Sequence, residues 1–471
     1  MFSVTSLGFL PFMALFVCLW YRVPQPSRWK LVLAANAVFC LSIDIGAFFA
    51  VALATAVVWQ AAQHAQPEQP SRRGWLALGL AAALLPLLVL KYSGMLVPGL
   101  RDLYKPFGLA YYSLQLAGYL LDVWHGRTAP TPSYARLWCY AGFFLSLTQG
   151  PFNRYNTLMP QLEAAPKTFE TQRLVSGLQR SAWGYFKKFA IADRAAIVVS
   201  AAFADPASFD RSQLIFATVM YSFQLYADFS GYTDIVLGMG EILGLHLPEN
   251  FRQPFFADSV KDIWARWHIS LSQWLRDYIY IPLGGSRCSK ARKDGNLIIT
   301  FLVSGLWHGT GLQFAVWGLL HGAYLAVGRL TAPARARLWR ASHIPEQSAP
   351  ARGLKMLVTF VLVWFGWVFF RAPTLSGALH LFARMPDSFS LAPPALKNAL
   401  AMLGFNSGML VRVGFACALL CAVDFAARRT GFSAWLAGRR KWFQAALYVL
   451  VLAILFLAPI GASPTPIYFQ F

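Results

Sequence analysis

Charged residues are scarce in this chain. Only 13% of its 471 residues are Asp, Glu, Lys or Arg, whereas 57% carry hydrophobic side chains. A soluble globular domain takes about a quarter of its residues from the charged types, because its surface has to be hydrated. The composition therefore excludes a water-soluble globular protein. Long apolar runs that recur along the chain indicate a multi-pass integral membrane protein instead.

Acidic residues are the scarcer of the charged types. There are 20 Asp and Glu against 41 Lys and Arg, a formal net charge of +21. The basic residues form short clusters between apolar runs, at 22–30, 72–73, 329–340, 428–429 and 439–441. This distribution is typical of cytoplasmic loops under the positive-inside rule and argues against a nucleic-acid surface. A second role for some of this charge is to attract an anionic donor at the inner face.

Several motifs that define other chemistries are missing. The six cysteines show neither CxxC spacing nor a disulfide framework, so we expect no metal site. A Walker A loop, a nucleotide-binding glycine fingerprint, a GxSxG elbow and an HExxH helix are also absent. These absences weaken ATP-driven transport, serine hydrolysis and zinc proteolysis. We also find no internal repeat and no inverted-half symmetry of the kind that many transporters show.

The apolar runs predict an all-α fold of about 11–13 transmembrane or re-entrant helices. The expected spans lie near 7–20, 31–42, 43–60, 75–90, 107–122, 137–150, 176–200, 212–227, 297–308, 312–328, 355–371, 411–427 and 442–460. Residues 61–73 and 330–353 are expected to be loops. The first basic cluster follows the first span, so we expect the N-terminus outside. The last span follows Arg439, Arg440 and Lys441, which predicts that Tyr468 and the C-terminus are outside too.

One segment differs from its apolar flanks. Residues 247–287 combine charges, Trp and Pro in the stretch PENFRQPFFADSVKDIWARWHISLSQWLRDYIYIPLGGSR. We expect one or two helices that start near Ser259 and are interrupted at Pro282 and Gly284–Gly285. Such a segment is buried in protein or lies at the inner interface, because its charges exclude a lipid-facing span.

His308 is the most conspicuous polar residue within an apolar run. It lies in FLVSGLWHGTGLQFAVWGLLHG beside Trp307, and glycines on both sides permit close approach of a helix or a substrate. An imidazole with a pKa near neutrality can take a proton from a hydroxyl and return it to a leaving group. The alternative from spacing alone is a histidine that only hydrogen-bonds between helices.

His268 is the second candidate. At helical spacing it shares a face with Ser272, and neighbouring tryptophans supply aromatic walls. A satisfied core histidine is the competing interpretation. His321, more than one turn beyond His308, is expected to pack between helices.

Charged residues inside apolar runs form a second group of candidates. Asp228 and Asp234 lie in YSFQLYADFSGYTDIVLGMGEILG, where each is expected to find a basic or hydroxyl partner. They either orient a catalytic group or form structural pairs. Arg154, in SLTQGPFNRYNTLMPQL, is expected to be a buried or interfacial charge partner. Lys187 and Lys188 are expected to snorkel at a membrane edge.

These motifs resemble the membrane-bound O-acyltransferase family, in particular the bacterial branch with alginate O-acetyltransferase and the D-alanyl transferase of teichoic acids. The resemblance runs from about Lys91 to the C-terminus. It rests on GLAYYSLQLAGYLLDV, QGPFNRYNTLMPQL, YFKKFAIADR, FQLYADFSGYTDIVLGMG, the stretch quoted above from ENF to LGG, and SGLWHG. One departure is Asn153, which stands where the branch usually has an apolar residue.

The resemblance implies a fold, an activity and site residues. It implies a ring of helices around a central funnel, in a single membrane-embedded domain over 1–471. We divide this domain into peripheral N-terminal spans (1–90), a catalytic core (91–328), C-terminal spans (329–460) and an outer aromatic tail (461–471). By the resemblance His308 is the signature histidine, His268 its polar partner, and Tyr468 in the tail PIYFQF the residue that carries the acyl group outward.

The expected reaction is acyl transfer across a bacterial inner membrane. A cytoplasmic thioester, acetyl-coenzyme A or an acyl carrier protein, supplies an acetyl or D-alanyl group, with no tightly bound cofactor. His308 is the general base on a hydroxyl such as that of Tyr468, whose phenol ionises poorly at neutral pH. The expected partners are the donor or carrier protein, a periplasmic acyltransferase partner with its polysaccharide, and membrane lipid. A transporter of acylated precursors and a scaffold of a secretion complex remain alternatives.

Overall fold

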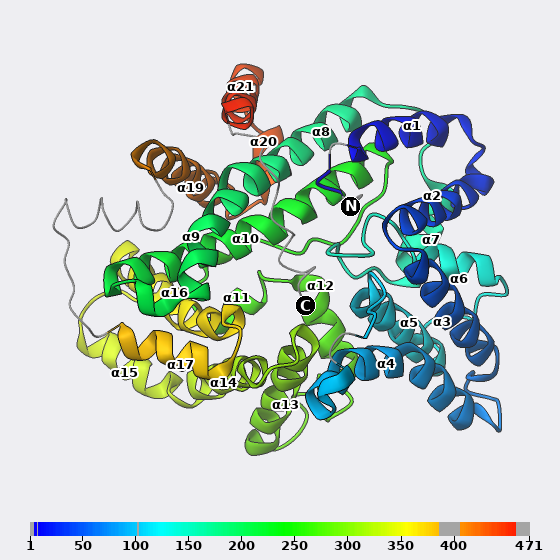
Figure 1. Cartoon of the computed structure of the whole chain (residues 1–471), viewed down its shortest axis with the longest axis horizontal. Helices are drawn as coiled ribbons and strands as arrows, with labels where there is room; N and C mark the ends of the chain where they lie inside the picture. The colour runs from blue at the N-terminus through cyan, green and yellow to red at the C-terminus, as the bar shows by residue number, and fades with distance from the viewer. Residues whose placement is uncertain (1–3, 7, 101–102, 386–405, 458–471) are drawn as a thin grey trace. The chain divides into compact units, whose positions relative to one another are not determined.

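The computed structural model describes residues 4–6, 8–100, 103–385 and 406–457 (Figure 1). Within these ranges the chain consists of helices joined by loops, and the only β-type pairing is an isolated antiparallel bridge between Phe251 and Trp267. The all-α prediction is therefore confirmed. The expected ring around a funnel and the expected division of the domain stay predictions.

The chain divides into two compact units, each described by itself. The first comprises Met1–Ala182 and Tyr232–Glu249. Its helices are α1 (Phe9–Arg22), α2 (Arg28–Ile43), α3 (Ile45–His64), α4 (Arg72–Leu96), α5 (Leu109–Trp124), α6 (Tyr134–Ala141), α7 (Tyr155–Ala164), most of α8 (Thr171–Phe186) and the last part of α10 (Arg211–Ile242). Short 3₁₀ turns lie at Gln25–Ser27 and Pro98–Leu100.

The second unit comprises Trp183–Gly231 and Asn250–Phe471. Besides the end of α8 and the first part of α10, its helices are α9 (Asp193–Ala204), α11 (Val260–Trp264), α12 (Ile269–Leu275), α13 (Lys290–His308), α14 (Leu312–Leu330), α15 (Ala332–Ala341), α16 (Ala349–Arg371), α17 (Leu375–Arg384), α19 (Ser407–Ala427), α20 (Phe432–Ala437) and α21 (Lys441–Leu457). Two π-helical segments, Lys187–Ala192 and Arg276–Tyr280, and 3₁₀ turns at Pro206–Ser208 and Pro254–Phe256 complete it.

Among the described residues, four helices are long and apolar enough to cross a membrane: α3, α4, α16 and α19. They match the expected spans at 43–60, 75–90, 355–371 and 411–427, and α1 and α21 are shorter apolar helices at the expected first and last positions. The multi-pass membrane prediction is confirmed.

Three predictions about elements are wrong in detail. The run 137–150 is helical only as far as Ala141, after which the backbone is irregular. The expected span at 212–227 is part of α10, a helix of 32 residues that continues through both Asp228 and Asp234. The expected loop at 330–353 contains α15. Pro333 lies in the first turn of this helix, where a missing backbone N–H costs no hydrogen bond.

The irregular backbone after α6 is held by buried side-chain amides. Asn36 accepts from the Phe144 N–H at 2.9 Å and donates to the Cys139 carbonyl at 2.9 Å. The Asn153 side-chain amide donates to the Ser146 hydroxyl at 3.0 Å, and the backbone carbonyl of Asn153 accepts from the Tyr140 hydroxyl at 2.9 Å. Buried backbone groups outside a helix need such partners, particularly in a membrane. The polar residue at 153 thus fits its site through its amide.

The helix pair α13–α14 is packed through glycines. A Cβ on Gly318 would lie 3.0 Å from the Leu302 Cα, and a Cβ on Gly322 would lie 2.8 Å from the Ile298 Cα. Small residues allow helix backbones to approach this closely inside a membrane. At the far end of the pair, Arg329 binds Asp294, with Nε 2.8 Å from Oδ1. The two helices therefore run antiparallel in a fixed register, with His308 at one end and a charged pair at the other.

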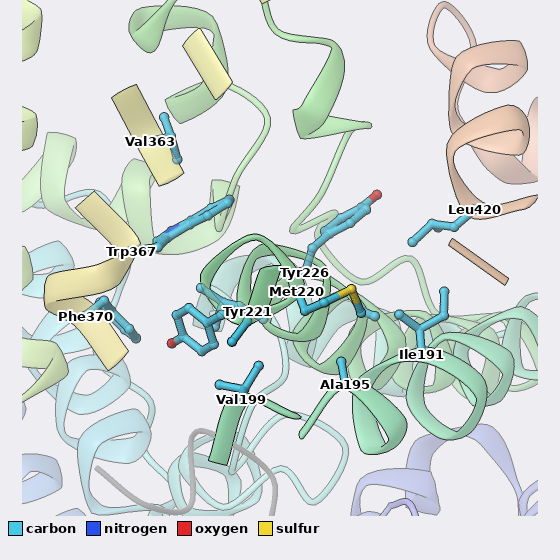
Figure 2. Packing of buried hydrophobic residues seen from close by; sticks show 14 of the residues in the cluster. Ile191, Ala195, Val199, Met220, Tyr221, Tyr226, Val363, Trp367, Phe370 and Leu420 are labelled. Atoms are coloured by element: carbon cyan, nitrogen blue, oxygen red, sulfur yellow. The ribbon is translucent and has the colours of Figure 1, made fainter. Parts of the chain in front are cut away.

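A hydrophobic core joins the helices of the second unit. Figure 2 shows Tyr221 and Tyr226 of α10 between residues of α9, α16 and α19, with Trp367 and Phe370 of α16 on one side and Leu420 of α19 on the other. The Tyr226 hydroxyl donates to Asp424 at 2.6 Å. Because α16 also contributes Phe370 to the site described next, this core fixes one wall of that site.

Candidate active site

His308 is the last residue of α13 and is 5% exposed. Three aromatic rings enclose its imidazole, with centroids 4.8 Å (Trp307), 5.4 Å (Trp317) and 5.1 Å (Phe370) from it. Trp317 comes from α14 and Phe370 from α16, so three helices build the surroundings of this one side chain. The enclosure excludes bulk water, which strengthens electrostatic interactions at the imidazole.

His268 is the residue at which the 247–287 segment changes direction. It separates α11 from α12, is 1% exposed, and has left-handed backbone angles of φ 44° and ψ 51°. An L-residue other than glycine adopts this conformation only when its surroundings impose it. The sequence predicted a helical face shared by His268 and Ser272, whereas the structure places His268 at the N-cap of α12.

Asn250 holds this strained backbone in place. Its carbonyl accepts from the Ile269 N–H at 3.1 Å, and its Oδ1 accepts from the N–H of Ser270 at 3.2 Å and from the Ser270 hydroxyl at 2.6 Å. Asn250 is fully buried, so these bonds are formed away from water. The two residues that follow the left-handed turn are thereby tied to Asn250, one through its backbone and the other through its side chain.

The structure brings the two candidate histidines together. The His268 and His308 ring centroids are 6.3 Å apart with an interplanar angle of 70°. Trp307 lies against both, at 6.2 Å from His268, and Phe229 of α10 packs edge-on against His268 at 4.7 Å. Two buried imidazoles this close together can both take part in accepting, holding and returning a proton.

Ser272, the third polar residue predicted in this segment, bonds to the backbone. Its hydroxyl donates to the Trp267 carbonyl at 3.5 Å, at the start of α12. An orienting role for Ser272 toward a substrate stays a prediction.

Asp228 has the basic partner that the sequence required, and that partner corrects another prediction. Lys188 Nζ lies 2.6 Å from Asp228 and 2.9 Å from Asp193, and all three side chains are buried. Lys187 is buried as well, with Nζ over the rings of Trp183 and Tyr226. The expectation that both lysines snorkel at a membrane edge is therefore wrong. Both lie on a π-helical segment, a feature often found at functional sites.

In the first unit, Asp234 and Arg154 are also ion-paired. Arg180 Nε lies 3.1 Å from Asp234, and its terminal nitrogens bind Glu249 at 2.6 Å and 2.7 Å. Arg154 lies 4.0 Å from Asp122 and is partly exposed. The predicted pairing of these residues is confirmed, and a role in orienting substrate stays a prediction.

Some residues of this site were not predicted, and one prediction cannot be compared. Phe229 and Phe370 come from positions distant in the sequence, whereas Trp317 and Asn250 lie in the quoted stretches around the histidines but were not singled out there. Tyr468 lies outside the described residues, and its proposed acyl-carrying role stays a prediction.

Taken together, the described residues form an all-α membrane fold that holds a buried pair of imidazoles, groups that are chemically able to transfer a proton. The family model of MBOAT, the membrane-bound O-acyltransferase family, matches residues 126–349. The chain is 34% identical over 393 residues to "Probable alginate O-acetylase AlgI" of Azotobacter vinelandii, covering 79% of this chain and 76% of that protein.

Two further relatives have related names. The chain is 30% identical over 453 residues to "Peptidoglycan O-acetyltransferase" of Helicobacter pylori, covering 87% of this chain and 84% of that protein. It is 27% identical over 294 residues to "Teichoic acid D-alanyltransferase" of Bacillus subtilis, covering 58% of this chain and 74% of that protein. The chain belongs to the membrane-bound O-acyltransferase family, and it is a membrane O-acyltransferase.

Proposed function

We propose that this enzyme transfers an acetyl group from a cytoplasmic thioester to a hydroxyl of a cell-envelope polysaccharide, with His308 as the general base. The observation that carries the proposal is the buried His268–His308 pair, 6.3 Å apart at the end of α13. Two relatives that cover most of this chain are named O-acetylase or O-acetyltransferase, which favours acetyl over D-alanyl.

The proposed reaction needs only one proton shuttle. His308 takes the proton of the acceptor hydroxyl while the hydroxyl oxygen attacks the thioester carbonyl carbon. The C–S bond then breaks, and the imidazolium returns the proton to the departing sulfur. The products are an O-acetyl ester and a free thiol, so no further reactant is required. His268 hydrogen-bonds the acceptor or orients His308 in this scheme.

The orientation and partners follow from charge. The basic end of α13 and α14, with Lys290, Arg292 and Arg329, faces the cytoplasm under the positive-inside rule and receives the thioester. Both termini then lie outside a bacterial inner membrane, where the polysaccharide and a periplasmic partner accept the acetyl group. Coenzyme A and a carrier protein are both thioesters that this scheme accommodates.

A transfer assay with purified protein tests the proposal. The enzyme in detergent is incubated with radiolabelled acetyl-coenzyme A or acetylated carrier protein, and label on polysaccharide is counted. We expect His308→Ala to lower the rate about 100- to 10,000-fold, the usual contribution of a positioned base. His380→Ala, at an exposed position on α17, is the matched control. Undiminished transfer by His308→Ala would show that the base is another residue.

A further inference from the structure

A buried carboxylate in an apolar helix of the second unit has no part in the reaction proposed above. Asp424 lies in α19 and is 4% exposed. Its Oδ2 accepts from the hydroxyl of Tyr226 in α10 at 2.6 Å. An ionisable residue within a membrane helix is costly, which makes it a candidate for a functional role. A hydrogen bond to a carboxylate is also stronger than one between neutral groups, so Asp424 fixes the position of the Tyr226 hydroxyl.

The ring of Tyr226 packs against the segment that carries His268. Its centroid lies 4.9 Å from that of Phe255, 5.8 Å from that of Phe251 and 6.1 Å from that of Trp267. The phenol is therefore held at both ends. Its hydroxyl is bound by α19, and its ring contacts the residues before and within the turn at His268.

Two of the residues that Tyr226 contacts are paired with each other. Phe251 and Trp267 form the isolated antiparallel bridge, and their ring centroids are 5.1 Å apart. Beside this bridge the Arg252 N–H donates to the Arg266 carbonyl at 2.9 Å. His268 directly follows Trp267 and has the left-handed backbone described above. A displacement of the bridge therefore displaces the backbone of His268.

We propose that Asp424 is a positioning residue for His268. By binding the hydroxyl of Tyr226, it keeps the ring of this tyrosine against the bridge, and the bridge keeps the His268 imidazole at its place beside His308. This inference rests on the proposed function, because it assumes that His268 takes part in that reaction. A displacement of about 1 Å at a reacting group costs about 100-fold in rate, so a shift of a fraction of this distance is measurable.

A second tyrosine of α10 provides a matched comparison. Figure 2 shows the Tyr226 hydroxyl pointing toward the side of α19, where Leu420 lies, and the Tyr221 hydroxyl pointing away from it. The Tyr221 hydroxyl is buried and has no hydrogen-bond partner among the described residues. Removing the Tyr221 hydroxyl therefore breaks no bond, whereas removing that of Tyr226 breaks the bond to Asp424.

Single substitutions give the first part of the test. Each variant is assayed in detergent with radiolabelled acetyl-coenzyme A or acetylated carrier protein for kcat and for KM of the thioester, and its melting temperature is measured. Tyr226→Phe and Asp424→Leu each leave one buried partner without the other, so we expect a lower melting temperature and a kcat lowered about tenfold. The KM is expected to change by less than about twofold. Tyr221→Phe, the control, should match the wild type in all three quantities.

The double variant separates positioning from stability. Replacing both partners of a buried hydrogen bond by apolar groups of similar shape is nearly neutral for stability. Tyr226→Phe combined with Asp424→Leu should therefore regain most of the melting temperature of the wild type. Its kcat should stay about tenfold low, because the ring is no longer anchored. Asp424→Asn keeps an acceptor oxygen for the Tyr226 hydroxyl and should retain kcat within about threefold.

The possible outcomes distinguish this inference from the proposed function. If kcat recovers together with the melting temperature in the double variant, the pair only supports the fold and the inference is wrong. Equal kcat in Tyr226→Phe and Tyr221→Phe would contradict it as well. Full activity of His308→Ala would instead refute the proposed base. If Asp424→Leu alone does not fold, the double variant and Asp424→Asn give the same comparison.

Discussion

Replacing Lys188 should destabilise the protein strongly, because its charge is buried against two carboxylates. Its ammonium lies 2.6 Å from Asp228 and 2.9 Å from Asp193, and the side chains of all three are at most 4% exposed. Lys188→Met keeps most of the side-chain volume and removes the ammonium that contacts both carboxylates. Breaking a buried ion pair by removing one partner costs about 3–5 kcal/mol, because the remaining charge stays buried.

The expected change is large enough to measure by thermal unfolding in detergent. A loss of this size lowers the apparent melting temperature of a chain of this length by about 3–5 °C. Lys261→Met, at an exposed position on α11, is the matched control and is expected to change the melting temperature little. The double variant Lys188→Met with Asp228→Asn is expected to recover part of the loss, because it removes one of the two carboxylates that the lysine neutralises. A melting temperature of Lys188→Met equal to that of the Lys261→Met control would refute this reasoning.

Two other predictions concern the site and its supporting helices. Asn250→Ala removes the acceptor for two hydrogen bonds of Ser270, so we expect it to lower the free energy of unfolding by about 1–3 kcal/mol and to lower kcat as well. Ser270→Ala should have the same effects at smaller size. If both variants have the kcat of the wild type, the hydrogen bonds of Asn250 do not support the function of His268. Gly318→Ala should separate α13 from α14 and lower the melting temperature, because its Cβ would meet the α13 backbone. The control is Gly328→Ala on the same helix, whose Cβ meets nothing within 4 Å, so this variant is expected to be neutral or slightly stabilising. An equal loss of melting temperature in both variants would contradict the close contact.

The sequence predicts well wherever a local pattern determines the structure. The apolar runs of α3, α4, α16 and α19 predict the positions of these helices, because their hydrophobicity comes from the residues themselves, although α4 and α16 extend beyond the predicted bounds. A helix starts near Ser259 as predicted, with the Ser259 side chain accepting from the Asp262 N–H as N-cap, and the break near Gly284–Gly285 has the left-handed backbone that glycine permits. His308 is recognisable because a titratable group in an apolar run is costly unless it is used.

Prediction fails where partners distant in sequence decide the outcome. The span expected at 212–227 stops before Asp228, whereas α10 continues through this residue, whose carboxylate binds Lys188 of the π-helical segment Lys187–Ala192. The same pair buries a lysine that the sequence places at a membrane edge. The span expected at 137–150 is helical only as far as Ala141, and no local pattern indicates that Asn36, more than a hundred residues earlier, binds the irregular backbone at Phe144. The role of Asn250 could not be predicted for the same reason, because its partner Ser270 is twenty positions away.

The left-handed backbone at His268 sets stability against chemistry at one position. A side chain there costs about 1–2 kcal/mol of backbone strain that a glycine would avoid, but His268→Gly would exchange this strain for a cavity against Phe229 and Trp307 and would lose the imidazole. Stability alone therefore does not explain a histidine at this turn. A programme that aims at a robust catalyst has to select for turnover at every round, and look for its gains in parts of the chain away from this turn.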